Sequence, residues 1–171
     1  MTTQEIKKYS QKIKLQADDI LKDTTLIETL NEFGKVDIIG SYPLDIMYNP
    51  DIDIVVETKD TREKSLKAIT KLLELRQFQK YEYGDFVKFP RIKRSKGFII
   101  VLKTTVEDIK WEIEIWFLEA TKEQVDQLNW ISERLTTSNK EKILEAKDLR
   151  ENSGQSKHQL SSYEIYNQIL K

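Results

Sequence analysis

Cysteine is absent from the 171 residues of this chain, which contain a single histidine, three prolines and five glycines. Without cysteine the chain forms no disulfide and offers no thiolate for a metal site or for nucleophilic catalysis. No apolar run in the sequence reaches the length of a membrane span, and the first residues do not have the pattern of a signal peptide. We therefore expect a cytoplasmic protein that has no membrane partner.

An excess of charge of one sign is also missing from the sequence. The 28 basic and 29 acidic residues give a net charge of −1, so no overall field draws the chain to nucleic acid, and any basic footprint must be local. Charged residues make up 33% of the chain and hydrophobic residues 39%. With so little glycine and proline, this composition is typical of a folded, helix-rich protein of about one domain.

Two aspartates lie at the start of a strand-like run that follows a loop. Residues 36–39 form a short apolar run, and residues 52–56 form a β-branched one. Asp51 and Asp53 are two positions apart, so in a strand they project from the same face, about 6–7 Å apart at the backbone. Two carboxylates at this separation repel each other unless a cation lies between them, and Mg²⁺ prefers oxygen ligands. The pair is a candidate metal site.

The first apolar run ends at Gly40 and Ser41. A glycine allows the backbone to approach a ligand closely, and the amide and hydroxyl of the serine that follows can donate to phosphate oxygens. The sequence therefore predicts phosphate donors across one cleft from the candidate metal ligands.

A later strand offers a further acidic residue on one face. Apolar and polar residues alternate over residues 111–117, which is the period of a strand, and Glu112 and Glu114 share a face. This alternation alone leaves both glutamates open as site residues.

The order Gly40-Ser41, nine residues, then Asp51 and Asp53 resembles the signature of the DNA polymerase beta-like nucleotidyltransferase superfamily, which includes small minimal enzymes and poly(A) polymerases. The resemblance implies transfer of a nucleoside monophosphate from a nucleoside triphosphate to an acceptor, with release of pyrophosphate. It also implies that the aspartates bind Mg²⁺ or Mn²⁺ and that Gly40 and Ser41 bind the nucleotide.

The superfamily pattern also includes a third acid between apolar residues on a neighbouring strand. Glu114 lies between Ile113 and Ile115 and is the residue we expect in that role, with Glu112 in reserve. The catalytic and metal-binding set implied by the resemblance is therefore Asp51, Asp53 and Glu114.

The fold implied by the resemblance is α/β (α+β), with a mixed sheet of four to five strands flanked by helices and a helical C-terminal portion. We expect a catalytic core over residues 1–119 and a helical extension over residues 120–171 that packs on the same domain. Hydrophobic periodicity predicts helices near residues 3–22, 26–33 and 61–76, and strands at 86–92 and 97–103.

A cluster of cations follows the third predicted helix, with Lys88, Arg91, Lys93, Arg94 and Lys96 within nine residues. Such a run is either solvated surface or, in a nucleotidyltransferase, a patch that faces phosphates.

The partners expected from the sequence are a nucleoside triphosphate and an unknown acceptor, for which a small molecule or a protein is favoured over RNA because the chain is nearly neutral. A homodimer is possible. The alternative hypothesis is a non-catalytic nucleotide-binding protein, or an antitoxin-like interaction protein, that retains the fold.

Overall fold

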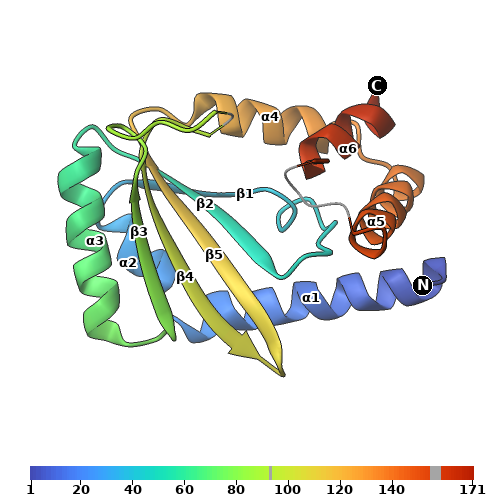
Figure 1. The fold of residues 1–171 in the computed structure, drawn as a ribbon, viewed down its shortest axis with the longest axis horizontal. Coiled ribbons are helices and arrows are strands. Elements are labelled where there is room, and N and C mark those ends of the chain that lie inside the picture. Colours follow the sequence, from blue (N-terminus) through green and yellow to red (C-terminus); the bar gives the residue numbers. More distant parts are fainter. Residues whose placement is uncertain (93, 155–158) are drawn as a thin grey trace.

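A mixed five-stranded sheet forms the centre of the computed structural model, which describes residues 1–92, 94–154 and 159–171 (Figure 1). The strand order is β1-β2-β5-β4-β3; β2 and β5 are parallel, and the other neighbours are antiparallel. The strands are β1 (Lys35–Ile39), β2 (Asp51–Glu57), β3 (Lys80–Asp85), β4 (Phe98–Val106) and β5 (Ile109–Leu118). The predicted α+β class and mixed sheet are confirmed.

Helices surround this sheet, and their bounds are α1 (Thr3–Asp23), α2 (Leu26–Asn31), α3 (Thr61–Leu75), α4 (Lys122–Ser132), α5 (Thr137–Asn152) and α6 (Ser162–Leu170). Capping boxes begin the first and the last of them, through Thr2 with Glu5 and through Ser161 with Glu164. Within the described residues, none of the helices has the length and apolar character needed to cross a membrane.

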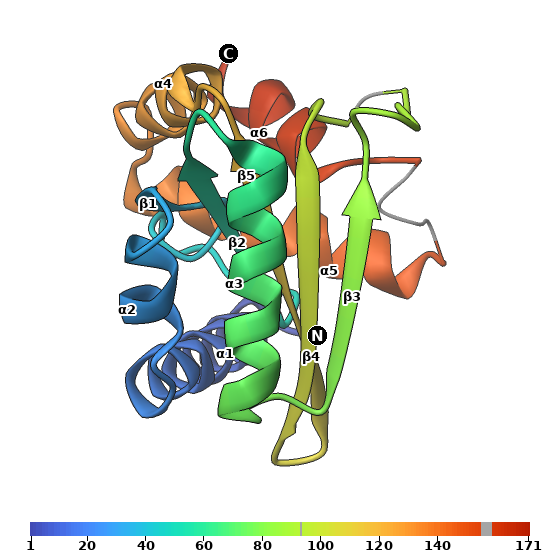
Figure 2. The same cartoon turned by 90° about the vertical axis from the view of Figure 1, so that its left-hand side faces the viewer.

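The main hydrophobic core lies between one face of the sheet and the first three helices. Ile52 and Ile54 of β2 and Ile113 of β5 are fully buried there, together with helix residues such as Ile13 and Leu72. Successive residues of a strand point to opposite faces of the sheet. Because these isoleucines point into the main core, the residues between them point to the opposite face. Figure 2 shows α3 running lengthwise in front of the strands.

A second core joins the C-terminal helices to the connecting loop, which we define as residues 40–50 between β1 and β2. Leu44 and Ile46 of this loop pack with Ile143 of α5 and Ile165 of α6. The helical C-terminal portion therefore packs around the connecting loop and the first part of α1, whereas the rest of α1 covers the sheet together with α2 and α3. The boundary expected between residues 119 and 120 stays a prediction.

The strand predicted over residues 86–92 is wrong, because the strand in this part of the chain is β3, which ends at Asp85. The carboxylate of Asp85 accepts hydrogen bonds from the backbone amides of Val87 (3.0 Å) and Lys88 (2.9 Å). A side chain that bonds amides two and three residues ahead stabilises a turn in place of an extended strand.

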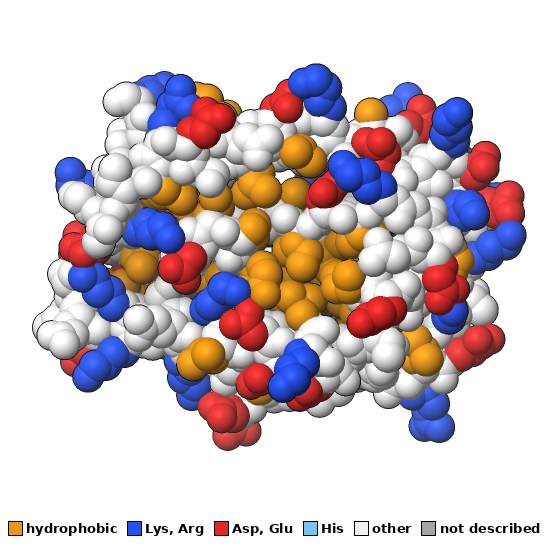
Figure 3. Space-filling view, turned by 180° about the vertical axis from the view of Figure 1, so that it is seen from behind, with side chains coloured by type: hydrophobic (Ala, Val, Ile, Leu, Met, Phe, Trp, Pro, Cys, Tyr) orange, Lys and Arg blue, Asp and Glu red, His pale blue; other side chains and the backbone are white. Residues whose placement is uncertain are grey.

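The surface carries charges of both signs. Figure 3 shows acidic and basic side chains interspersed around an apolar area in the middle of one face. This distribution agrees with the net charge of −1 and gives this face no field of a single sign.

Candidate active site

The acidic residues singled out in the sequence lie side by side on one face of the sheet. In the parallel pairing of β2 with β5, Asp51 is opposite Glu112 and Asp53 is opposite Glu114. All four alternate with fully buried isoleucines of the main core, so they project from the face opposite to that core. The structure therefore brings both aspartates and both candidate glutamates together at the start of β2.

Gly40 lies directly against the carboxylate of Asp53. Its backbone φ is +75°, and a Cβ added there would come within 2.3 Å of Asp53 Oδ2. Only glycine combines this left-handed conformation with so close an approach at low cost. Ser41 is buried, and its carbonyl accepts a hydrogen bond from the amide of Ile46 (3.2 Å). That Gly40 and Ser41 bind phosphate stays a prediction.

The two glutamates differ in exposure and in partner. The carboxylate of Glu112 pairs with Lys103 at 3.2 Å, and 44% of its side chain is exposed. The carboxylate of Glu114 accepts a hydrogen bond from Arg94 Nη1 at 3.3 Å, and 20% of its side chain is exposed. The glutamate opposite Asp53 is thus the less exposed one, which favours Glu114 as the third acid.

Arg94 belongs to the basic loop, which we define as residues 86–97, between β3 and β4. The ring of Phe86 stacks on Trp116, with centroids 5.3 Å apart, and the Phe86 amide donates to the carbonyl of Gly97 (2.9 Å). Near the other end of the loop, Ser95 Oγ accepts a hydrogen bond from Gln124 of α4 at 3.4 Å. These contacts hold the basic loop beside the face that carries the acids.

Only one cation of the predicted basic cluster contacts a candidate site residue in the described part of the loop, and it is Arg94. The guanidinium of Arg91 lies over the ring of Phe86, 5.1 Å from its centroid. Lys93, which belonged to the predicted cluster, lies outside the described residues.

Helix α5 fixes the connecting loop with buried charged residues that the sequence analysis did not single out. Lys147 Nζ donates to the carbonyl of Ile46 (2.8 Å), and Arg150 Nη2 donates to Asn49 Oδ1 (2.8 Å). Both charged side chains belong to residues that are only 1% exposed. The sequence contained a signal for them, because they continue the helical spacing of the buried Ile143 by four and seven positions.

A tyrosine of α6 lies within electrostatic range of the aspartates. Tyr166 is buried, and burial raises the pKa of its hydroxyl; the negative charges of Asp53 and Asp51 raise that pKa further. The tyrosine is therefore neutral at physiological pH, and it brings α6 within electrostatic range of the aspartates. This proximity could not be seen in the sequence, because more than a hundred positions separate the partners.

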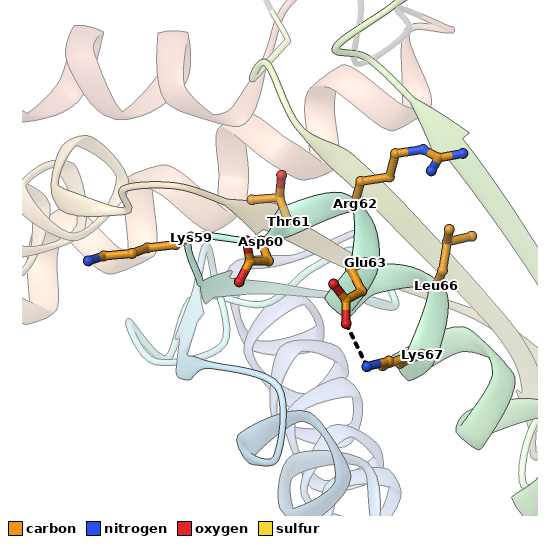
Figure 4. A pocket seen from close by; sticks show the side chains of 7 residues that line it. All are labelled: Lys59, Asp60, Thr61, Arg62, Glu63, Leu66 and Lys67. Atoms are coloured by element: carbon orange, nitrogen blue, oxygen red, sulfur yellow. Dashed lines mark hydrogen bonds and ion pairs between the residues drawn. The ribbon is translucent and has the colours of Figure 1, made fainter.

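A surface hollow of about 640 Å³ lies elsewhere, at the start of α3 (Figure 4). It follows the carboxyl end of β2, whereas the aspartates occupy the beginning of that strand, about 13 to 20 Å away at the rise of a strand. Its charged lining includes the ion pair of Glu63 with Lys67 (2.6 Å). The hollow and the acidic face are thus separate features.

The acidic face supplies the kind of ligand that a hard divalent cation takes. Carboxylate oxygens on adjacent strands are the ligands that Mg²⁺ and Mn²⁺ prefer. Within the part of the chain that the structure describes, no group of three or more Asp, Glu, His or Cys side chains is close enough together to chelate a metal. Glu114, the expected third acid, is hydrogen-bonded to Arg94. The residue types and their common face suit a divalent ion, but the carboxylates of the described residues are not gathered closely enough to chelate one in this conformation.

Comparison with solved structures assigns the fold to the nucleotidyltransferase-like class. The polymerase core of TRAMP, an RNA surveillance complex, matches 91% of this chain with a TM-score of 0.60 and 18% identity. The Cid1 poly(U) polymerase matches 95% with a TM-score of 0.60 and 15% identity, and a cytoplasmic RNA terminal U-transferase matches 94% with a TM-score of 0.58 and 18% identity.

The chain spans about half the length of these proteins, since the matches cover 48%, 53% and 50% of their chains. No family model and no curated protein sequence matches the chain. At identities this low the likeness defines the fold, and the chemistry has to be argued from the residues of this chain.

Proposed function

We propose that this protein is a metal-dependent nucleotidyltransferase. The observation that carries the proposal is the pairing of Asp51 and Asp53 with Glu112 and Glu114 on one face of a sheet whose fold is that of RNA nucleotidyltransferases. A hydroxyl oxygen of the acceptor forms a bond to the α-phosphorus of a nucleoside triphosphate. The bond from that phosphorus to the β-phosphate oxygen breaks, and pyrophosphate leaves with the bonding electrons.

Asp51, Asp53 and Glu114 are the residues we propose to hold Mg²⁺ or Mn²⁺. When bound, such an ion supplies neutralising charge and orientation for the triphosphate. We assign the binding of the outgoing phosphates to the amide and hydroxyl of Ser41 and to the backbone at Gly40. We also assign to the carboxylate of Glu114 the role of helping the attacking hydroxyl to lose its proton.

The acceptor that we propose is a hydroxyl of a small molecule or of a protein. The nearly balanced charge of the chain provides no long-range attraction for a polyanion. By their names, the poly(U) polymerase and the terminal U-transferase act on RNA, but each is about twice as long as this chain. The test therefore includes an RNA acceptor, and transfer to it would contradict the proposed acceptor class.

The test follows the label from α-³²P nucleoside triphosphates onto added acceptors: small hydroxylated molecules, folded proteins and an oligoribonucleotide. Asp53→Asn removes one proposed ligand while preserving size, so we expect transfer to be abolished with an unchanged circular dichroism spectrum. Glu114→Gln should lower the rate strongly, whereas Glu112→Gln, its neighbour on the same face, should leave it near the wild-type value.

Full activity of Asp53→Asn would sink the proposal. Metal-dependent binding of a triphosphate without any transfer would instead support the non-catalytic alternative. Label that appears on the oligoribonucleotide alone would keep the reaction but correct the acceptor.

A further inference from the structure

The contact between Arg94 and Glu114 joins the basic loop to the proposed metal site. The guanidinium Nη1 donates to Glu114 Oε2 at 3.3 Å across twenty positions of sequence. The arginine side chain is 43% exposed and the glutamate side chain 20% exposed. A cation on an exposed, flexible stem is thus paired with the least exposed candidate glutamate of the acidic face.

Contacts near both ends of the basic loop hold these ends beside the sheet and α4. Phe86 stacks on Trp116, two residues along β5 from Glu114, and Ser95 is bonded to Gln124 of α4. Gly97 leaves no room for a side chain, because a Cβ there would come within 2.5 Å of the carbonyl oxygen of Phe117. These contacts anchor the ends of the loop, and the hydrogen bond to Glu114 directs Arg94 to the acidic face.

We propose that Arg94 is an exchange residue that couples nucleotide binding to assembly of the metal site. Without a nucleotide, its guanidinium neutralises Glu114. When a triphosphate enters, the guanidinium moves to a phosphate group, and Glu114 becomes available as a metal ligand. This inference rests on the proposed function and adds a mechanism by which the site responds to its substrate.

The chemistry of the guanidinium permits this exchange. Its planar fork binds a carboxylate or a phosphate with the same paired N–H donors. A partly exposed ion pair contributes little free energy, so a ligand that brings both phosphate and a divalent ion can replace it. Glu114 loses one positive partner, the guanidinium, and gains another, the divalent ion.

If this exchange occurs, Arg94→Ala should raise the affinity for a metal ion alone and lower the affinity for a triphosphate. Arg94→Ala frees Glu114 in the absence of nucleotide, so Mn²⁺ alone should bind about two- to fivefold more tightly. The same change removes a phosphate partner, so the magnesium complex of inorganic tripolyphosphate should bind about tenfold more weakly. Electron paramagnetic resonance of free Mn²⁺ and isothermal titration calorimetry measure the two affinities.

Arg91→Ala is the matched control, because it removes the same charge from the same loop while Arg91 lies over the Phe86 ring. We expect it to change each affinity by less than about twofold. If Arg91→Ala and Arg94→Ala give equal changes, the effect is that of loop charge in general, and the exchange role is overturned. No change in either affinity for Arg94→Ala overturns it as well.

The double variant Asp51→Asn/Asp53→Asn separates this inference from the function on which it rests. If that variant binds Mn²⁺ as well as the wild type does, the aspartates are not the metal site and both proposals fail. If it loses Mn²⁺ binding while Arg94→Ala behaves like Arg91→Ala, the metal site stands and only the exchange role is lost.

Discussion

Gly40 occupies a position where both the backbone and the neighbouring carboxylate exclude a side chain. Its φ of +75° is matched by the φ of +71° at Gly154, but a Cβ at Gly154 would meet nothing within 4 Å, whereas one at Gly40 would meet Asp53 Oδ2 at 2.3 Å. The two glycines therefore share a left-handed backbone conformation, but only at Gly40 would a side chain meet a neighbouring group.

Substitution by alanine at each position isolates that contact. Gly154→Ala should cost about 1 kcal/mol in the free energy of unfolding, from backbone strain alone. Gly40→Ala should cost at least about 1 kcal/mol more, because Asp53 must move. Urea denaturation measures both, and equal losses would show that Gly40 does not approach the carboxylate as described.

Asp148 is a buried carboxylate whose protonation affects the stability of the fold. Burial raises its pKa, but the hydrogen bonds that it accepts, beginning with that from the Tyr48 hydroxyl (2.7 Å), outweigh burial and hold the pKa below its usual value of 3.8. A carboxylate with a lowered pKa in the folded state stabilises the fold above the unfolded pKa. That contribution is lost as the pH falls through the folded value.

We expect Asp148→Asn to be less stable than the wild type by about 1–2 kcal/mol at pH 7, with the gap closing below about pH 4. Asp126→Asn is the control, because Asp126 pairs with Lys122 at the surface and should change stability by less than about 0.5 kcal/mol. Chemical denaturation across pH 3–7 gives both curves. A gap for Asp148→Asn that does not depend on pH would contradict the assignment.

At the site, period-two alternation was sufficient to predict which acids share a face. Residues two positions apart in a strand point the same way, so Asp51 and Asp53 share a face of β2, and Glu112 and Glu114 share a face of β5. The choice of Glu114 as the third acid came from the resemblance to the nucleotidyltransferase superfamily. The contact of Glu114 with Arg94 could not be predicted in this way, because it depends on the conformation of the basic loop.

The helices and strands were predictable to different degrees. Amphipathic spacing located α1, α2 and α3 closely, and the strand with the glutamates is β5. The alternation around Tyr81 and Tyr83 in β3 was missed, and residues 86–92 were interpreted as a strand because of their apolar content. The turn that overrides that content depends on the side chain of Asp85 and the amides it bonds.

Helix α5 acts as a clamp on the connecting loop. Arg150 donates to Asn49 Oδ1 and to Glu151 Oε1 (2.9 Å), and its residue is 1% exposed. Asn49 is two residues before Asp51, so the hydrogen bond from Arg150 fixes the chain just before the start of β2. Removing a buried charged donor leaves its acceptors unsatisfied.

Arg150→Ala should therefore lower the free energy of unfolding by about 2–4 kcal/mol. Leu149→Ala, one position away on the same helix and 70% exposed, should change it by less than about 0.5 kcal/mol. Thermal and urea unfolding of the two variants test the difference. Equal free energies of unfolding for Arg150→Ala and Leu149→Ala would mean that the connecting loop is held without the hydrogen bonds of Arg150.

Among the described residues of the molecule there are three hydrophobic clusters, and the two largest meet at the connecting loop. One core lies between the sheet and the first three helices, and the other lies between that loop and the C-terminal helices. The aspartates follow directly after the loop, and Tyr166 of α6 lies within range of their charge. We expect the C-terminal helices to be needed for the geometry of the acidic face as well as for stability.

The central claim is that the acidic face binds a nucleoside triphosphate with a divalent ion. Thermal melting with each of the four ribonucleoside triphosphates, with and without Mg²⁺, tests it in the wild type and in Asp51→Asn/Asp53→Asn. A ligand at 100 times its dissociation constant adds about 2.7 kcal/mol to the stability of the folded state. We predict a magnesium-dependent rise in melting temperature that the double variant loses; no shift with any triphosphate, with or without Mg²⁺, would contradict the account.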